Sequence, residues 1–182
     1  MRCCSMIASK RRREIDFNEE YSGGISRIVD YICKDAPLYG FMLKGSVGNG
    51  KSTLLEALNE MTSIFVREGL SETKHIFKLV TSQEIVDAYM RDRIRYDELL
   101  NANFVIVDEF GDEPLQVMEY GTPACPIHNF LYERYRRIKF TVIGTNLTLH
   151  SMSQRYDERL VDRLREMYPP EAQITFTHPS YR

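Results

Sequence analysis

The sequence lacks the features of membrane, secreted and zinc-binding proteins. It has no run of about 18 apolar residues and no N-terminal apolar stretch long enough for a signal peptide, so neither a membrane-spanning helix nor secretion is expected. Its four cysteines form no C-x-x-C pair and have no companion histidines at zinc-site spacing; we therefore expect reduced thiols in a cytoplasm. A net charge of −2 excludes a uniformly basic nucleic-acid-binding surface but is compatible with a local basic patch.

The length and composition are those of one globular domain. The chain has 182 residues, of which 43% are hydrophobic and 27% charged, which is enough for a substantial core. Residues 1–17 include a Lys-Arg-Arg-Arg run at positions 10–13, and we expect them to be a basic, flexible tail. Residues 18–182 are expected to form a single core.

One eight-residue segment indicates the chemistry. Residues 45–52 fit the pattern G-x-x-x-x-G-K-[ST] of the phosphate-binding loop of P-loop NTPases. Three glycines allow the backbone N–H groups to surround a phosphate, Lys51 can reach the β- and γ-phosphates, and the Ser52 hydroxyl can bind Mg²⁺. The predicted nucleotide-binding residues are Gly45, Ser46, Val47, Gly48, Asn49, Gly50, Lys51, Ser52 and Thr53.

Hydrophobic patterning places this loop between a strand and a helix, as the motif requires. Strands alternate with helices along the rest of the chain, which predicts an α/β fold with a parallel sheet. The expected strands span residues 41–44, 76–80, 104–107, 140–143 and 173–177. The expected helices span residues 18–34, 51–68, 83–95 with Ser82 as N-cap, 127–137 and 153–167. Proline and glycine residues predict a long loop over 111–126.

Polar residues follow two of the predicted strands. Asp108 and Glu109 come directly after four apolar residues, where Asp108 is placed to hold Mg²⁺ and Glu109 to deprotonate an attacking water. Glu113 is a less favoured substitute for Glu109. Asn146 follows the next strand and would lie beside the γ-phosphate if its strand is a neighbour of the other two; a turn asparagine is the alternative.

Together these motifs resemble the DnaC/IstB branch of the AAA+ ATPases, which comprises helicase loaders and transposition helper ATPases. The resemblance covers about residues 40–167 and includes residues 104–109 as Walker B, Asn146 as sensor 1 and residues 156–164 as box VII. It implies that Arg163 is an arginine finger acting on a neighbouring subunit, with Arg159 as its helper. Ion pairing of these arginines along a charged helix face is an equal alternative.

The chain departs from that family in three respects. A helical lid after box VII is expected to be absent or rudimentary, no sizeable N-terminal domain is expected, and the insert between Glu113 and Pro126 is unusual. The first two departures weaken the partner assignment rather than the ATPase assignment.

Two segments interleave basic and aromatic residues in a way that can track single-stranded DNA, although solvated helix faces look the same. They contain Arg91, Arg93, Arg95 and Tyr96, and then Arg134, Tyr135, Arg136, Arg137 and Lys139.

The motifs predict a slow Mg²⁺-dependent ATPase, and the family resemblance implies that it forms a homo-oligomer and helps to load a replicative helicase on single-stranded DNA. A transposition helper with a transposase as partner, a nucleotide-switched adaptor with little turnover and a small-metabolite kinase are the alternatives. Two observations argue against the kinase: the Asp108-Glu109 pair and Asn146.

Overall fold

Five short apolar segments form one parallel sheet in the computed structural model, which describes residues 2–10, 18–33 and 39–177. The strand order is β2-β3-β6-β1-β7, and all pairs are parallel. The strands are β1 (Met42–Gly45), β2 (Lys78–Thr81), β3 (Phe104–Phe110), β6 (Phe140–Thr145) and β7 (Gln173–Phe176). This arrangement confirms the predicted fold class.

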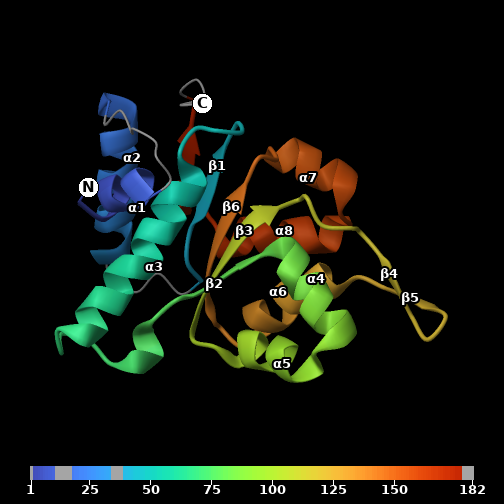
Figure 1. The fold of residues 1–182 in the computed structure, drawn as a ribbon. Helices are drawn as coiled ribbons and strands as arrows, with labels where there is room; N and C mark the ends of the chain where they lie inside the picture. Colours follow the sequence, from blue (N-terminus) through green and yellow to red (C-terminus); the bar gives the residue numbers. More distant parts are fainter. Residues whose placement is uncertain (1, 11–17, 34–38, 178–182) are drawn as a thin grey trace.

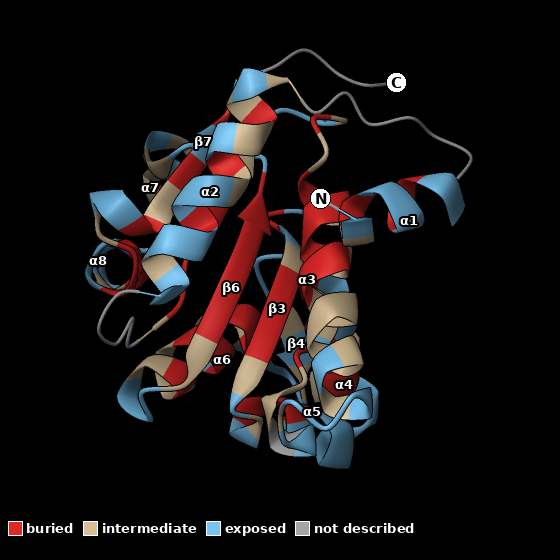
Figure 2. Ribbon diagram, turned by 90° about the vertical axis from the view of Figure 1, so that its left-hand side faces the viewer, coloured by how far each residue is buried: buried red, intermediate tan, exposed pale blue. Residues whose placement is uncertain are grey.

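Helices cover both faces of the sheet (Figure 1). One side carries α1 (Arg2–Lys10), α2 (Glu19–Cys33) and α3 (Lys51–Arg67). The other carries α4 (Ser82–Arg91), α5 (Arg93–Asn101), α6 (Pro126–Arg136), α7 (Leu149–Arg155) and α8 (Glu158–Met167). The two 3-10 turns are η1 (Thr73–His75) and η2 (Pro170–Ala172). Figure 2 shows β3 and β6 buried between these layers, as is expected for parallel strands covered on both faces.

None of the described helices is long and apolar enough to cross a membrane. After α8, the described residues contain only η2 and β7, without a helical bundle.

Two of the predicted helices are each divided by an aspartate. The helix expected over 83–95 ends at Arg91, and the side chain of Asp92 caps α5 by accepting the Arg95 N–H at 3.0 Å. The helix expected over 153–167 is divided into α7 and α8 by Asp157, which caps α8. An aspartate at an N-cap satisfies an unpaired backbone N–H, so it begins a new helix in a new direction. The cap of α4 is Thr81, one residue before the expected Ser82.

The loop expected over 111–126 contains a β-hairpin. Strands β4 (Val117–Glu119) and β5 (Thr122–Ala124) pair in antiparallel fashion around Tyr120 and Gly121. Both turn residues have positive φ, 49° and 84°, as a two-residue type I′ turn requires. The hairpin projects from the body on the side of α4 (Figure 1).

Part of the segment expected to be a flexible tail is helical. Residues 2–10 form α1, which buries Cys4, Ile7 and Ala8 and packs against α3, because these apolar residues recur at helical spacing. Residues 11–17, with most of the basic run, lie outside the described residues. All four cysteines are free thiols, as expected.

Arg134 of α6 is the largest fully buried side chain. Its guanidinium donates hydrogen bonds to five oxygen atoms, three of them carbonyls at the C-terminal end of α5. The acceptors are the carbonyls of Leu99 (3.0 Å), Leu100 (3.3 Å), Ala102 (2.8 Å) and Phe140 (2.7 Å) and the hydroxyl of Thr141 (2.8 Å). Burial lowers the pKa of Arg134 to about 10, so it is still a cation at neutral pH. A cation is favourable at a helix C-terminus, where carbonyls are otherwise unpaired.

We predict that Arg134→Met lowers the free energy of unfolding by about 3 kcal/mol or more, because it leaves several buried carbonyls without donors. Urea unfolding at neutral pH measures the change. Arg136→Met is the matched control on the same helix; Arg136 is exposed and pairs only with Glu133, so its replacement should cost less than about 1 kcal/mol. Equal losses in the two variants would contradict the role given to Arg134.

Candidate functional site

Residues 45–52 form a loop between β1 and α3, and the backbone at Gly45 and Gly50 leaves no room for a side chain. Gly45 has φ of 150°, and a Cβ there would lie 2.3 Å from the Phe176 carbonyl oxygen. Gly50, with φ of 90°, is the residue before α3, and its Cβ would lie 2.8 Å from the Tyr21 ring. The loop therefore opens at the N-terminus of a long helix, where backbone N–H groups are unpaired and favour anions.

The Asn49 side chain links this loop to the edge strand β7 by a hydrogen bond. Its side chain is 1% exposed; Nδ2 donates to the Phe176 carbonyl at 3.0 Å, and Oδ1 accepts from Lys51 Nζ at 3.1 Å. The side chains of Ser46 and Val47 are exposed to solvent, whereas that of Thr53 is buried in the first turn of α3.

Lys51 is buried within its own loop. Its Nζ donates to the carbonyls of Gly45 at 2.7 Å and Ser46 at 2.8 Å. Burial lowers the pKa of Lys51 to about 8, against the opposing effect of Asp108 and Asp112. The ammonium is thus surrounded by oxygen acceptors, which phosphate oxygens can replace.

Tyr21 of α2 contacts the loop at Gly50, and it was not among the predicted site residues. The tyrosine is 1% exposed, its hydroxyl donates to the Gly50 carbonyl at 3.3 Å, and its ring packs against Phe176 at 5.4 Å between centroids. Tyr21 precedes Gly50 by 29 residues in sequence, and no local pattern indicates this contact.

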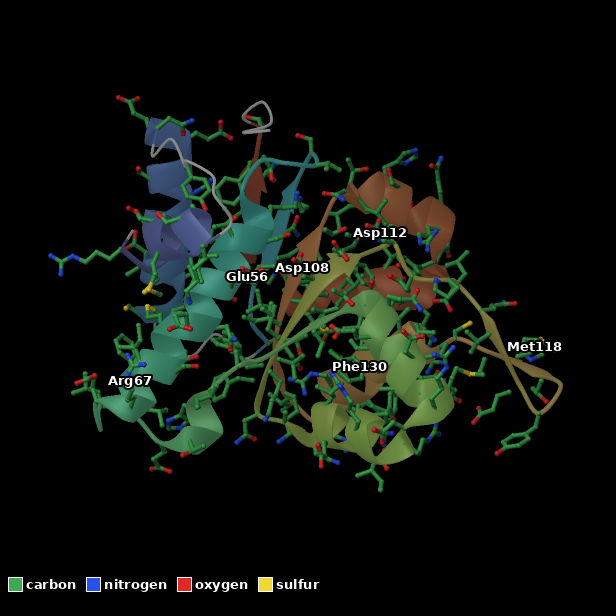
Figure 3. The ribbon with its side chains drawn as sticks, in the orientation of Figure 1. Glu56, Arg67, Asp108, Asp112, Met118 and Phe130 are labelled. Carbon is green, nitrogen blue, oxygen red and sulfur yellow. The ribbon has the colours of Figure 1, made fainter. Side chains whose placement is uncertain are left out.

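Asp108 and Glu109 lie where β3 approaches the loop, and Asp108 influences the charge state of Lys51. Asp108 Oδ1 accepts the Glu109 N–H at 2.9 Å, and Gly144 of β6 leaves room for it, since a Cβ there would lie 2.6 Å from this oxygen. Figure 3 shows Asp108 on the strand end, with Asp112 beyond it.

Glu109 is exposed and has φ of 55°, a conformation that costs free energy in residues other than glycine and is concentrated at functional sites. Its carbonyl is held by the buried hydroxyl of Ser82 at 2.7 Å. Glu113, the less favoured alternative base, is buried at 1% exposure and does not face solvent. The geometry therefore favours Glu109 over Glu113 for contact with water.

Asn146 follows β6, which lies between β1 and β3 as the prediction required. Thr145 pairs with Lys44 on one side and Phe110 on the other, so the exposed Asn146 comes just beyond the ends of both strands. Thr145 fixes this turn: its hydroxyl donates to the Phe110 carbonyl at 2.7 Å and accepts the Leu147 N–H at 3.0 Å.

These residues suit a magnesium ion held partly by a nucleotide. The described residues contain no group of three His, Cys, Asp or Glu side chains that could hold a metal alone. Mg²⁺ in nucleotide sites needs few protein ligands, because phosphates and waters complete its shell. The Ser52 hydroxyl and the half-buried Asp108 carboxylate are oxygen donors of that kind.

The structure does not bring Arg159 and Arg163 to the phosphate loop of their own chain. Their guanidinium groups lie over two tyrosine rings of α6, Arg159 over Tyr132 at 4.9 Å and Arg163 over Tyr135 at 5.1 Å. Arg163 also pairs with Glu166 at 2.8 Å, one of the ion pairs considered as the alternative. In this chain, therefore, both arginines are engaged with α6 and α8 rather than with residues 45–52.

The two basic segments are only partly exposed. Tyr96 and Arg134 are buried, so neither can contact DNA, which corrects that part of the prediction. Arg91 and Arg93 border a groove of about 470 Å³ between α4 and the hairpin. The groove is lined by Tyr89, Met90, Arg91, Arg93, Met118, Glu119 and Tyr120. Tyr120 is fully exposed at the hairpin turn, and Met118 stands away from the body of the molecule (Figure 3).

Comparisons with known proteins identify the fold. Neither protein-family models nor curated proteins match the sequence. Among solved structures, a DnaC helicase loader is 18% identical, with a TM-score of 0.64 over 90% of this chain and 94% of that one. DnaI is 17% identical, with a TM-score of 0.64 over 93% of this chain and 88% of that one. AMPPCP-bound DnaA from Aquifex aeolicus is 18% identical, with a TM-score of 0.53 over 84% of this chain and 46% of that one. At these identities the likeness establishes the fold alone, a parallel sheet flanked by helices, as the sequence predicted.

We predict that the affinity for Mg·ATP falls as the pH rises through about 8, by up to about tenfold per pH unit. Lys51 is deprotonated above this pH in the free protein, whereas bound phosphates favour its charged form, so binding must take up a proton. Titration calorimetry between pH 7 and 9.5 measures the affinity, and circular dichroism checks that the fold is retained. A constant affinity over this range would contradict the assignment.

Proposed function

We propose that the chain is a Mg²⁺-dependent ATPase that helps to load a replicative helicase. The observation that carries the proposal is the neighbouring position of β1, β6 and β3, which gathers Lys51, Asp108 and Asn146 at one edge of the sheet. The fold shared with a DnaC helicase loader and DnaI supports a replicative helicase as partner, and a transposase is the alternative.

Each residue at this edge has a distinct task. Bound Mg·ATP would supply the phosphoanhydride bond and the cation that neutralises its phosphates. Lys51 and the loop N–H groups bind the phosphates, while Ser52 and Asp108 would hold the cation. The exposed carboxylate of Glu109 accepts a proton from the attacking water, and the Asn146 side chain orients that water.

Arg163, with Arg159 as its helper, acts on the nucleotide of a neighbouring copy. Both guanidinium groups lie over tyrosine rings of α6, where Arg159 is exposed and Arg163 is half-buried. An arginine offered in this way stabilises charge in the transition state. This role makes a homo-oligomer the active form.

Single-stranded DNA is proposed to lie in the groove between α4 and the hairpin. Tyr120 offers an exposed ring on which a base can stack, and Arg91 offers a cation to the phosphates. The buried Tyr96 and Arg134 contribute to the fold only.

Lys51→Ala is expected to abolish ATP binding, whereas Glu109→Gln should keep binding and stop turnover. The reason is that Lys51 contacts the ground-state phosphates and Glu109 acts only on water. Nucleotide affinity and phosphate release, measured with and without single-stranded DNA, separate the two effects. Equal loss of binding in both variants would contradict this division of roles, and binding without turnover in the wild type would favour the nucleotide-switched adaptor.

Tyr120→Ala should weaken binding of a single-stranded oligonucleotide by about fivefold or more, the loss expected for one stacked base. Arg91→Ala should lower the slope of log affinity against log salt by about 0.7, because one phosphate contact is lost. Fluorescence anisotropy at several salt concentrations measures both. Arg67→Ala is the control, since Arg67 is also exposed but lies on α3 on the other side of the sheet (Figure 3). Effects no larger than in the control would exclude the groove.

A further inference from the structure

Glu113 is a buried acid that the proposed ATPase mechanism does not use. It follows the Walker B strand by three residues and is 1% exposed. Its Oε2 accepts the Gly111 N–H at 2.8 Å, and its Oε1 accepts a hydrogen bond from the Tyr156 hydroxyl. Its backbone carbonyl accepts from the Arg155 guanidinium. A buried carboxylate is costly unless such donors satisfy it, so the group has a fixed position.

Tyr156 connects Glu113 to the helix that carries the surface arginines. Tyr156 and Asp157 are the two residues between α7 and α8, and Asp157 caps α8 by accepting the Leu160 N–H at 2.7 Å. Arg159 and Arg163 lie in the first two turns of this helix. The hydrogen bond that holds the Tyr156 hydroxyl therefore fixes the place at which α8 begins.

An aromatic contact reinforces the same connection. The Tyr156 ring stacks on Phe110, the last residue of β3, with centroids 5.0 Å apart and an interplanar angle of 17°. Gly111, whose N–H binds Glu113, packs so closely on Leu147 that a Cβ would lie 2.5 Å from that side chain. The Walker B strand end, the turn after β6 and the start of α8 thus meet at one buried cluster.

We infer that Glu113 is a positioning residue which, through Tyr156, fixes the strand end carrying Glu109 relative to the helix carrying Arg159 and Arg163. The inference rests on the proposed function, in which Glu109 acts within its own subunit and the arginines act on the next. The hydrogen bond between Tyr156 and Glu113 then fixes the position of the catalytic base Glu109, which acts within its own subunit. It also fixes the arginines that act on the next subunit.

Hydrogen exchange tests the connection without any assay of hydrolysis. In Tyr156→Phe, which keeps the stacked ring, the Gly111 amide should exchange at least about fivefold faster, although it lies 45 positions away. Glu113→Gln should likewise speed exchange of the Leu160 amide at the start of α8. Tyr168→Phe is the control, because it removes another buried hydroxyl, bonded to the Thr141 carbonyl, at the opposite end of α8. Unchanged exchange at the distant amide in both variants, or equal changes in the control, would overturn the inference.

Assemblies that mix two variants test whether this positioning affects ATP hydrolysis across subunits. Subunits with Lys51→Ala cannot hydrolyse ATP but can offer arginines, and subunits with Arg163→Ala can hydrolyse but cannot offer them. Adding Tyr156→Phe to the Lys51→Ala subunit should lower the rate of the mixture by about tenfold or more, because small displacements of catalytic groups are costly. ATP affinity measured in Tyr156→Phe alone should stay within about twofold.

The outcomes separate the two proposals. Failure of the unmodified pair to restore turnover would refute the action of arginines across subunits, while the exchange result would still decide whether Glu113 and Tyr156 connect β3 to α8. Restored turnover that Tyr156→Phe leaves unchanged would refute the positioning role.

Discussion

The insertion of β6 between β1 and β3 is the constraint on which the proposed nucleotide site depends. In a parallel sheet all carboxyl ends lie at one edge, but only neighbouring strands bring their end residues within reach of one ligand. Here that adjacency joins a phosphate loop, two acidic residues and an asparagine that lie far apart in sequence. Gly144 at the centre of the arrangement keeps the space that Asp108 occupies. A different strand order would leave the same motifs unconnected.

Buried polar side chains fix the irregular segments around this sheet. Asn49 holds the phosphate loop, Ser82 holds the Glu109 backbone, and Arg134 binds the end of α5. Each group is almost fully buried and hydrogen-bonded to backbone or side-chain atoms of another element. A buried polar group without its partner costs more than the bond contributes, so such contacts favour one geometry over its neighbours. The loops of the site are therefore rigid where they meet the sheet.

The sequence predicted those parts of the fold that depend on local patterns. The phosphate loop follows from glycine and lysine spacing, and the central strand with Asp108 and Glu109 follows from a continuous apolar run. Helix divisions at Asp92 and Asp157 were missed because apolar periodicity continues across both aspartates. Tyr120-Gly121 was missed as a hairpin turn because tyrosine rarely adopts positive φ.

Contacts between distant segments leave no local signal. Tyr21 below the loop and Glu113 against Tyr156 depend on the packed structure, and Arg134 has the sequence environment of an exposed helix residue. For Asn146 the sequence predicted a place at the end of a strand, on the condition that this strand neighbours the other two. The sheet order, with β6 between β1 and β3, meets that condition.

The bond between Asn49 and the Phe176 carbonyl has a consequence for biosynthesis. The two residues are 127 positions apart, and β7 is the only described strand that borders β1 on the side away from β6. A ribosome exposes the phosphate loop early, yet the strand that anchors it emerges more than a hundred residues later. The loop therefore cannot be anchored in the geometry described here until translation has passed Phe176.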